Sequence, residues 1–139
     1  PTPMPNSPAP SATATGLKVL VAEDNIINQR LVVGLLTQLG HTGMVVNDGA
    51  KALKCLSKMK VDLVLMDVMM PNMDGLEALA AIRALEASQG GHVPVIMATA
   101  HDEPGDAARY KRSGADGYLP KPLEMGRLQA EISRVLALR

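Results

Sequence analysis

The stretch VDLVLMDVMMPNMDG, residues 61–75, decides the fold of this chain. It opens as a nearly continuous apolar run, which is the pattern of a parallel β-strand covered on both faces. The run ends at Asp67, and Pro71 and Gly75 then disfavour regular structure. Open α/β sheets carry their chemistry at the carboxyl ends of such strands, which makes Asp67 a candidate site residue. The competing interpretation is that Asp67 only caps the loop or the following helix.

Composition excludes several classes of function. Lysine and arginine together number 14, as do aspartate and glutamate, so no global field draws the chain to nucleic acid or to an anionic membrane. The two tyrosines are the only aromatic residues, which leaves little to stack on bases. Cys55 is the single cysteine and fits a reducing compartment, and no apolar run is long enough to cross a membrane. We therefore expect a cytoplasmic domain without direct contact to nucleic acid or membrane.

A segment of linker composition precedes an alternation of strands and helices. Residues 1–15 are mostly Pro, Ala, Ser and Thr and are expected to form a disordered linker, with residues 16–139 forming the folded domain. The expected strands are 17–22, 44–46, 61–66, 93–98 and 117–119, and the expected helices are 26–39, 49–58, 75–87, 106–113 and 124–138. Asn25, Asp48 and Asp74 are the expected caps of the first three helices.

This order of elements predicts an α/β fold. Strands that alternate with helices imply right-handed crossovers and a parallel sheet with helices on both faces. For five strands we expect the flavodoxin-like (βα)5 order 2-1-3-4-5, in which the first and third strands are neighbours. Glu23 and Asp24, which follow the first strand, would then meet Asp67 at one edge of the sheet.

Three neighbouring carboxylates need compensation. At about 5 Å and an effective dielectric of about 20, each ionised pair repels by roughly 3 kcal/mol. Protonation of one acid or binding of a hard cation relieves this repulsion. Oxygen ligands with several waters are what Mg²⁺ prefers, and no histidine lies beside these acids in the sequence. We therefore expect a Mg²⁺ site, with Mn²⁺ as the alternative ion.

The next two strand ends supply groups that complement these acids. Thr99 ends the fourth expected strand with a hydroxyl, and Lys121 follows the fifth between Pro120 and Pro122, which stiffen its backbone. A carboxylate nucleophile, a cation, a hydroxyl and an ammonium together suit a phosphoryl group. Taken singly, Thr99 could cap a turn and Lys121 could be a solvated surface charge. Their positions at consecutive strand ends favour the shared site.

Four separated motifs agree in order and spacing. They are Glu23-Asp24; Met66-Asp67 with Met70-Pro71 and Met73-Asp74-Gly75; Thr99-Ala100; and Gly114-Ala115-Asp116-Gly117-Tyr118-Leu119-Pro120-Lys121-Pro122. Together they resemble the receiver domain of two-component response regulators, from about residue 17 to the C-terminus. The resemblance implies a phosphorylation switch within a phosphorelay, with at most slow self-dephosphorylation.

The resemblance also implies roles for the site residues. Asp67 would accept the phosphoryl group from a phosphohistidine. Asp24, Asp67 and the Met69 carbonyl would ligate Mg²⁺, with Glu23 acting through water. Lys121 would pair with the phosphoryl oxygens.

A conformational switch is implied in the same way. Thr99, followed by Ala100, would swing to hydrogen-bond the phosphate, and Tyr118 would rotate inward behind it. The family's cis peptide would be Lys121-Pro122. New local charge would then bias a two-state element.

The segment Asn25-Ile26-Ile27-Asn28-Gln29 resembles the opening of receivers attached to hybrid sensor histidine kinases. We therefore expect the chain to be an excised part of such a kinase, so that the parent protein would be an enzyme. If that kinase is membrane-bound, the receiver would belong to its cytoplasmic part. The alternative is a stand-alone single-domain response regulator. The expected partner is a histidine kinase or a histidine-phosphotransfer domain.

Helical periodicity assigns the faces of the first helix. The residues assigned to the core are Ile27, Leu31, Val32, Leu35, Leu36 and Leu39. Ile26 and Val33 fall on the opposite face, and we expect them to form a docking surface for the partner together with Pro122 and Leu123. The competing interpretation is ordinary exposure of single apolar residues.

Two further functions stay open. A Mg²⁺-dependent phosphatase with an aspartyl-phosphate intermediate needs a second acid two residues after the nucleophile, and that position is Met69. A scaffold that never becomes phosphorylated would have no use for the combination of acids, hydroxyl and lysine described above.

Overall fold

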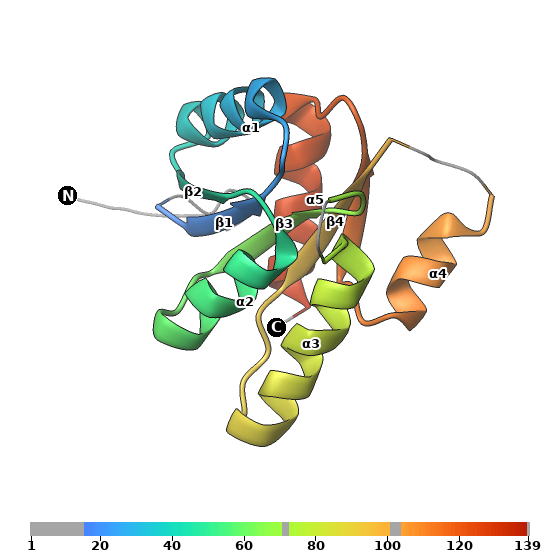
Figure 1. The fold of residues 1–139 in the computed structure, drawn as a ribbon. Helices are drawn as coiled ribbons and strands as arrows, with labels where there is room; N and C mark the ends of the chain where they lie inside the picture. Colours follow the sequence, from blue (N-terminus) through green and yellow to red (C-terminus); the bar gives the residue numbers. More distant parts are fainter. Residues whose placement is uncertain (1–15, 71–72, 101–103, 139) are drawn as a thin grey trace.

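The computed structural model describes residues 16–70, 73–100 and 104–138. The linker predicted for residues 1–15 lies outside these ranges, as does Pro71. The strands are β1 (Lys18–Ala22), β2 (Thr42–Val46), β3 (Leu63–Asp67), β4 (Val95–Thr99) and β5 (Gly117–Pro120). The helices are α1 (Ile26–Gln38), α2 (Gly49–Lys58), α3 (Gly75–Gln89), α4 (Asp106–Arg112) and α5 (Met125–Ala137). Strands and helices alternate along the chain as the sequence predicted (Figure 1).

The strands form one parallel sheet in the order β2-β1-β3-β4-β5, which confirms the predicted topology. In the register of β1 with β3, Ala22 lies opposite Met66, so the residues that follow them emerge side by side. In the register of β3 with β4, Asp67 lies opposite Ala98. The carboxyl ends of the three central strands therefore meet at one edge.

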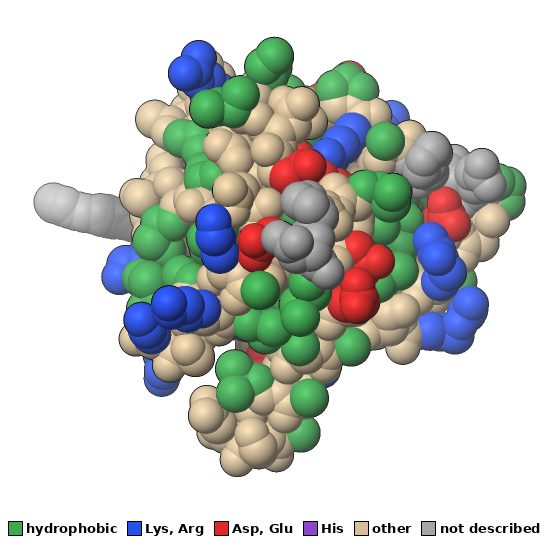
Figure 2. Space-filling model, viewed as in Figure 1, with side chains coloured by type: hydrophobic (Ala, Val, Ile, Leu, Met, Phe, Trp, Pro, Cys, Tyr) green, Lys and Arg blue, Asp and Glu red, His purple; other side chains and the backbone are tan. Residues whose placement is uncertain are grey.

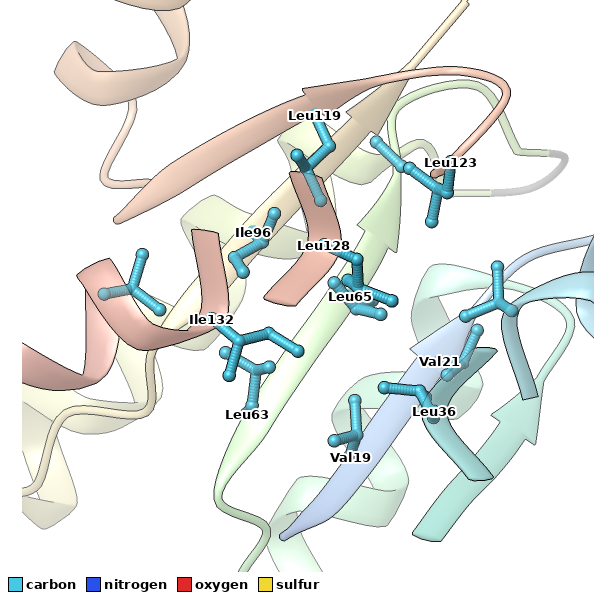
Figure 3. Packing of buried hydrophobic residues seen from close by; sticks show 13 residues of the cluster. Val19, Val21, Leu36, Leu63, Leu65, Ile96, Leu119, Leu123, Leu128 and Ile132 are labelled. Atoms are coloured by element: carbon cyan, nitrogen blue, oxygen red, sulfur yellow. The ribbon is translucent and has the colours of Figure 1, made fainter. Parts of the chain in front are cut away.

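Side chains on the strands alternate between two apolar clusters, one on each face of the sheet. The first cluster lies between the sheet and helices α1 and α5, and Figure 3 shows its strand residues Val19, Leu65 and Ile96 directed toward the helices. The second cluster lies between the sheet and helices α2, α3 and α4. Figure 1 shows α1 and α5 on one side of the sheet and α2 and α3 on the other. Burial on both faces explains why β3 and β4 read as continuous apolar runs.

The predicted caps begin the first three helices. The carboxamide of Asn25 accepts hydrogen bonds from the backbone N–H groups of Ile27 and Asn28, and the carboxylate of Asp48 accepts one from Lys51. Asp74 and Glu77 form a reciprocal capping box at the start of α3. Each cap satisfies backbone donors that the first turn of a helix leaves without partners.

The predicted faces of α1 are partly wrong. Val32 and Leu36 are buried as expected, but Ile27 is 73% exposed and Leu31 is 41% exposed. The reason is that α1 begins beyond the carboxyl end of β1, so its first turns have no strand beneath them. Val33, predicted to face solvent, is half-buried against β2, where its side chain adjoins Gly43.

None of the helices in the described parts of the chain combines the length and the apolar character needed to span a lipid bilayer.

Candidate functional site

Three carboxylates converge at the carboxyl edge of the sheet. Glu23 and Asp24 follow β1, and Asp67 is the last residue of the neighbouring strand β3. One oxygen from each of these carboxylates lies within 4.8 Å of the others. Figure 2 shows acidic side chains gathered near the middle of the face in view. The sequence prediction that these acids meet is confirmed.

Lys121 supplies the positive charge in this cluster. Its Nζ donates to Glu23 Oε1 at 2.7 Å and lies 3.0 Å from Asp67 Oδ2. Both acids are nearly buried, with Glu23 4% and Asp67 5% exposed. Burial by itself lowers the pKa of Lys121, but the hydrogen bonds and charges of Glu23 and Asp67 outweigh it and raise the pKa above its ordinary value. Lys121 therefore stays charged and compensates two of the three acids.

The donor set fits a hard divalent cation. All three groups offer carboxylate oxygens, and Asp24 is exposed, which leaves room for water on one side of the cluster. Together, the three acids carry more negative charge than the single ammonium of Lys121 neutralises. The arrangement matches what Mg²⁺ needs in ligand type and in charge.

Gly75 holds the loop after Asp67 against the end of β3, and the sequence interpretation missed this role. Its N–H donates to the carbonyl oxygen of Val68 at 2.8 Å. A Cβ added at Gly75 would overlap the carbonyl oxygen of Asp67 and the Cα of Val68. The available signal was a glycine at the first position of a helix, where its low helix propensity is otherwise a cost.

Thr99 ends β4 and is 2% exposed. Its carbonyl oxygen accepts a hydrogen bond of 2.7 Å from the backbone N–H of Lys121, which ties β4 to the site lysine. Its Oγ1 accepts a hydrogen bond of 3.2 Å from the hydroxyl of Tyr110 on α4. The sequence interpretation singled out Tyr118 and missed Tyr110; a tyrosine as the one large, partly apolar side chain of the short helix DAARYKR was the available signal.

Tyr118 on β5 is half-buried, and its ring lies 6.0 Å from that of Tyr110 between centroids. Ala100, the neighbour of Thr99, is exposed. The Lys121-Pro122 bond is cis, as the family resemblance implied.

The four residues predicted for docking have different exposures. Ile26 is 61% exposed and Pro122 is exposed, as a docking role requires. Leu123 is only 8% exposed and packs in the first apolar cluster. Ile27 and Leu31, assigned to the core from the sequence, instead enlarge the exposed apolar surface of α1.

A family model described as the response regulator receiver domain matches residues 19–133. The chain belongs to this family. The "Hybrid signal transduction histidine kinase I" of Dictyostelium discoideum is 46% identical over 111 residues, which are 76% of this chain and 6% of that protein. The receiver's fold and its resemblance to hybrid histidine kinases, both expected from the sequence, are thereby confirmed.

Two solved receiver domains resemble this one closely. The receiver of a sensor histidine kinase from Pseudomonas aeruginosa PAO1, solved with magnesium in its active site cleft, is 33% identical with a TM-score of 0.78, over 88% of this chain and 99% of that one. The receiver of the histidine kinase CKI1 from Arabidopsis thaliana, complexed with Mg²⁺ and BeF₃⁻, is 29% identical with a TM-score of 0.79, over 88% of this chain and 91% of that one.

Proposed function

We propose that this receiver accepts a phosphoryl group from a phosphohistidine onto Asp67 in a Mg²⁺-dependent reaction. One observation carries the proposal: Asp67 is a nearly buried carboxylate at the edge of the sheet that contacts the ammonium of Lys121 and clusters with two further acids. Asp62 enters β3 at its opposite end, where it accepts the N–H of Lys18, and Asp74 caps α3. Neither of these acids lies in the cluster.

The two carboxylate oxygens of Asp67 are held differently. Oδ1 accepts the N–H of Met69 at 3.2 Å, and Oδ2 faces Lys121. One of these oxygens attacks phosphorus, the phosphorus–nitrogen bond of the phosphohistidine breaks, and the imidazole leaves with the bonding electron pair. Lys121 follows the new negative charge and pairs with the phosphoryl oxygens.

The metal would be held by Asp24, Asp67 and the Met69 carbonyl, with Glu23 acting through water. When bound, Mg²⁺ neutralises charge on the phosphoryl oxygens during transfer. The magnesium in the active site cleft of the Pseudomonas receiver supports this ion for the present chain, and Mn²⁺ is the second candidate.

The proposed switch residues of this site are Thr99, Ala100 and Tyr118. Thr99 turns its hydroxyl toward the phosphoryl group, with the Ala100 backbone beside it and Tyr118 moving inward behind it. Support comes from the position of Thr99 at the end of β4, whose carbonyl is bonded to the N–H of Lys121.

The donor is a histidine kinase or a histidine-phosphotransfer domain. It docks on the exposed apolar residues Ile26, Ile27 and Leu31 of α1, which follow Glu23 and Asp24 in the chain, and on Pro122, which follows Lys121. Val33 and Leu123, also expected to dock, contribute little because packing within the domain covers them. The receiver works in the cytoplasm as part of a hybrid histidine kinase, with a stand-alone regulator as the alternative; the chain spans 6% and 7% of two hybrid signalling proteins that it matches.

Acetyl phosphate with MgCl₂, followed by intact mass spectrometry, tests the proposal. The wild type gains the mass of one phosphoryl group and keeps it over minutes, whereas Asp67→Asn gains none. Asp62→Asn is the matched control, because it removes the same charge at the other end of β3, and it is labelled like the wild type. Labelling of Asp67→Asn, or no labelling of the wild type, overturns the proposal. Rapid turnover without accumulation identifies a phosphatase instead.

A further inference from the structure

We propose that Tyr110 is a positioning residue of this receiver: its hydroxyl holds Thr99 in the unphosphorylated conformation and so couples α4 to the phosphoryl site. The proposal rests on the function assigned above to Asp67 and Thr99. Its basis is the hydrogen bond of 3.2 Å from the Tyr110 hydroxyl to Thr99 Oγ1, with Thr99 2% and Tyr110 1% exposed.

The sheet decides which way Thr99 faces. Along β4, Ile96 and Ala98 pack in the cluster under α1 and α5, whereas Val95 and Met97 pack in the cluster under α2, α3 and α4. Because side chains alternate along a strand, Thr99 continues the second set and meets Tyr110. Asp67 continues the opposite set, with Leu63 and Leu65. The hydroxyl of Thr99 is therefore held on the α4 side of the sheet.

Tyr110 is itself firmly placed. Its ring lies in the second apolar cluster, tilted at 50° to the ring of Tyr118, and the guanidinium of Arg109 sits 5.1 Å from its centroid. Ala115 follows α4 after a short turn, and its N–H donates to the carbonyl oxygen of Tyr110 at 3.0 Å. A change at the Tyr110 hydroxyl is thus transmitted to α4 and to the start of β5.

A competition follows from this geometry. When Thr99 turns its Oγ1 toward a phosphoryl group on Asp67, the hydrogen bond from Tyr110 breaks or Tyr110 moves with it. A buried hydroxyl that loses its partner is costly, so the bond favours the unphosphorylated form. Tyr110 thereby sets the affinity of the site for a phosphoryl group without touching it.

Beryllofluoride with Mg²⁺ is the probe, because it binds as a phosphoryl analogue and needs no donor. Tyr110→Phe, which keeps the ring and removes the hydroxyl, binds it about fivefold more tightly than the wild type, as expected for the loss of one neutral hydrogen bond. The control Ser113→Ala, which removes an exposed hydroxyl just after α4, stays within about twofold. Equal or weaker binding by Tyr110→Phe overturns the inference.

A double-mutant cycle shows whether the effect passes through Thr99. In a Thr99→Ala background the change Tyr110→Phe no longer alters beryllofluoride affinity. An undiminished effect in that background means that Tyr110 acts on the site by another route, and the inference fails. A purely structural role for Tyr110 would not depend on Thr99.

The aromatic content of the chain gives a direct readout. With two tyrosines, no tryptophan and no phenylalanine, the variant Tyr118→Phe leaves Tyr110 as the sole tyrosine. In this variant, carrying ¹³Cζ-labelled tyrosine, the single resonance shifts when Mg²⁺ and beryllofluoride saturate the site, and an unchanged resonance contradicts the coupling. Failure of the wild type to bind beryllofluoride at all overturns the proposed function as well, which separates the two results.

Discussion

At the scale of single residues, Lys121 is the counter-charge that allows two acids to lie nearly buried together. Its ammonium contacts both Glu23 and Asp67 within 3.0 Å. Removing it leaves carboxylates that repel each other by roughly 3 kcal/mol per ionised pair at about 5 Å and an effective dielectric of about 20. A divalent cation can then replace part of the lost compensation.

Lys121→Met is therefore expected to lower Tm in EDTA and to show a larger rise in Tm on addition of MgCl₂ than the wild type. The measurement is thermal unfolding by circular dichroism with and without Mg²⁺. Lys54→Met is the control, because it removes the same charge from an exposed lysine on α2. An equal Mg²⁺ response in the Lys121 variant and the wild type contradicts the role of Lys121 as counter-charge.

Gly75 offers a second test at this scale. Gly75→Ala places a methyl group against the carbonyl oxygen of Asp67, and we expect a loss of about 1–3 kcal/mol in the free energy of unfolding. Gly34→Ala is the matched control, because nothing lies within 4 Å of its added Cβ on α1. The control should gain about 0.5–1 kcal/mol from helix propensity. Urea titration measures both, and a similar change in the two variants would refute the close approach.

At the scale of elements, Arg83 joins α3 to the segments on either side of β4. Its guanidinium donates to the carbonyl oxygens of Val93 and Gly114 and to the carboxylates of Glu86 and Asp116, at 2.8–2.9 Å. Asp116 in turn accepts the N–H of Val95. This network fixes the amino end of β4 relative to β5, at the opposite edge of the sheet from the acids.

Arg83→Met is expected to cost about 2–3 kcal/mol in the free energy of unfolding, because it leaves partly buried acids and carbonyls without their donor. Arg127→Met removes an exposed pair with Glu124 and should cost about 0–1 kcal/mol. Chemical denaturation compares the two. Folded Arg83→Met should still be phosphorylated by acetyl phosphate to the same extent as the wild type, since the network lies away from Asp67.

At the scale of the whole molecule, His41 adds a pH dependence to stability. It is 7% exposed, its Nδ1 accepts the N–H of Leu17 at 3.3 Å, and burial lowers its pKa from the ordinary value of 6.5. The unfolded chain therefore binds a proton at a higher pH than the native chain does. The stabilisation of the native state by neutral, buried His41 is therefore fully present above pH 6.5, and it is lost as the pH falls below that value.

We expect the free energy of unfolding to fall as the pH is lowered from 7 toward 5, with part of the slope removed in His41→Gln. Urea titrations across this range measure the slope. An identical slope in the variant would assign the pH dependence to other groups.

Much of this molecule could be predicted from its sequence, for identifiable reasons. Short apolar runs such as the one before Asp67, in a chain that alternates strands and helices, are typical of parallel strands covered by helices on both faces. The order 2-1-3-4-5 then brought Glu23 and Asp24 to Asp67 without knowledge of any contact. The caps Asn25 and Asp74 followed from local chemistry alone.

What could not be predicted depends on how elements are placed against one another. Periodicity predicted which residues of α1 form its apolar stripe. It could not predict that Ile27 and Leu31 are exposed, because their exposure depends on where the helix lies relative to the end of β1. Likewise, nothing in the sequence of α4 indicates that Tyr110 reaches Thr99, since that contact requires the approach of α4 to the end of β4. The overlap at Gly75 is also a three-dimensional property.

The alternation of side chains at the end of the sheet has a last consequence. By that alternation, Asp67 belongs to the flank covered by α1 and α5, and Thr99 to the flank covered by α2, α3 and α4. A phosphoryl donor that docks over α1, as proposed above, and any protein that contacted α4 would therefore approach from opposite sides of the sheet. On the proposed docking surface, phosphoryl transfer to Asp67 would leave the surface of α4 uncovered.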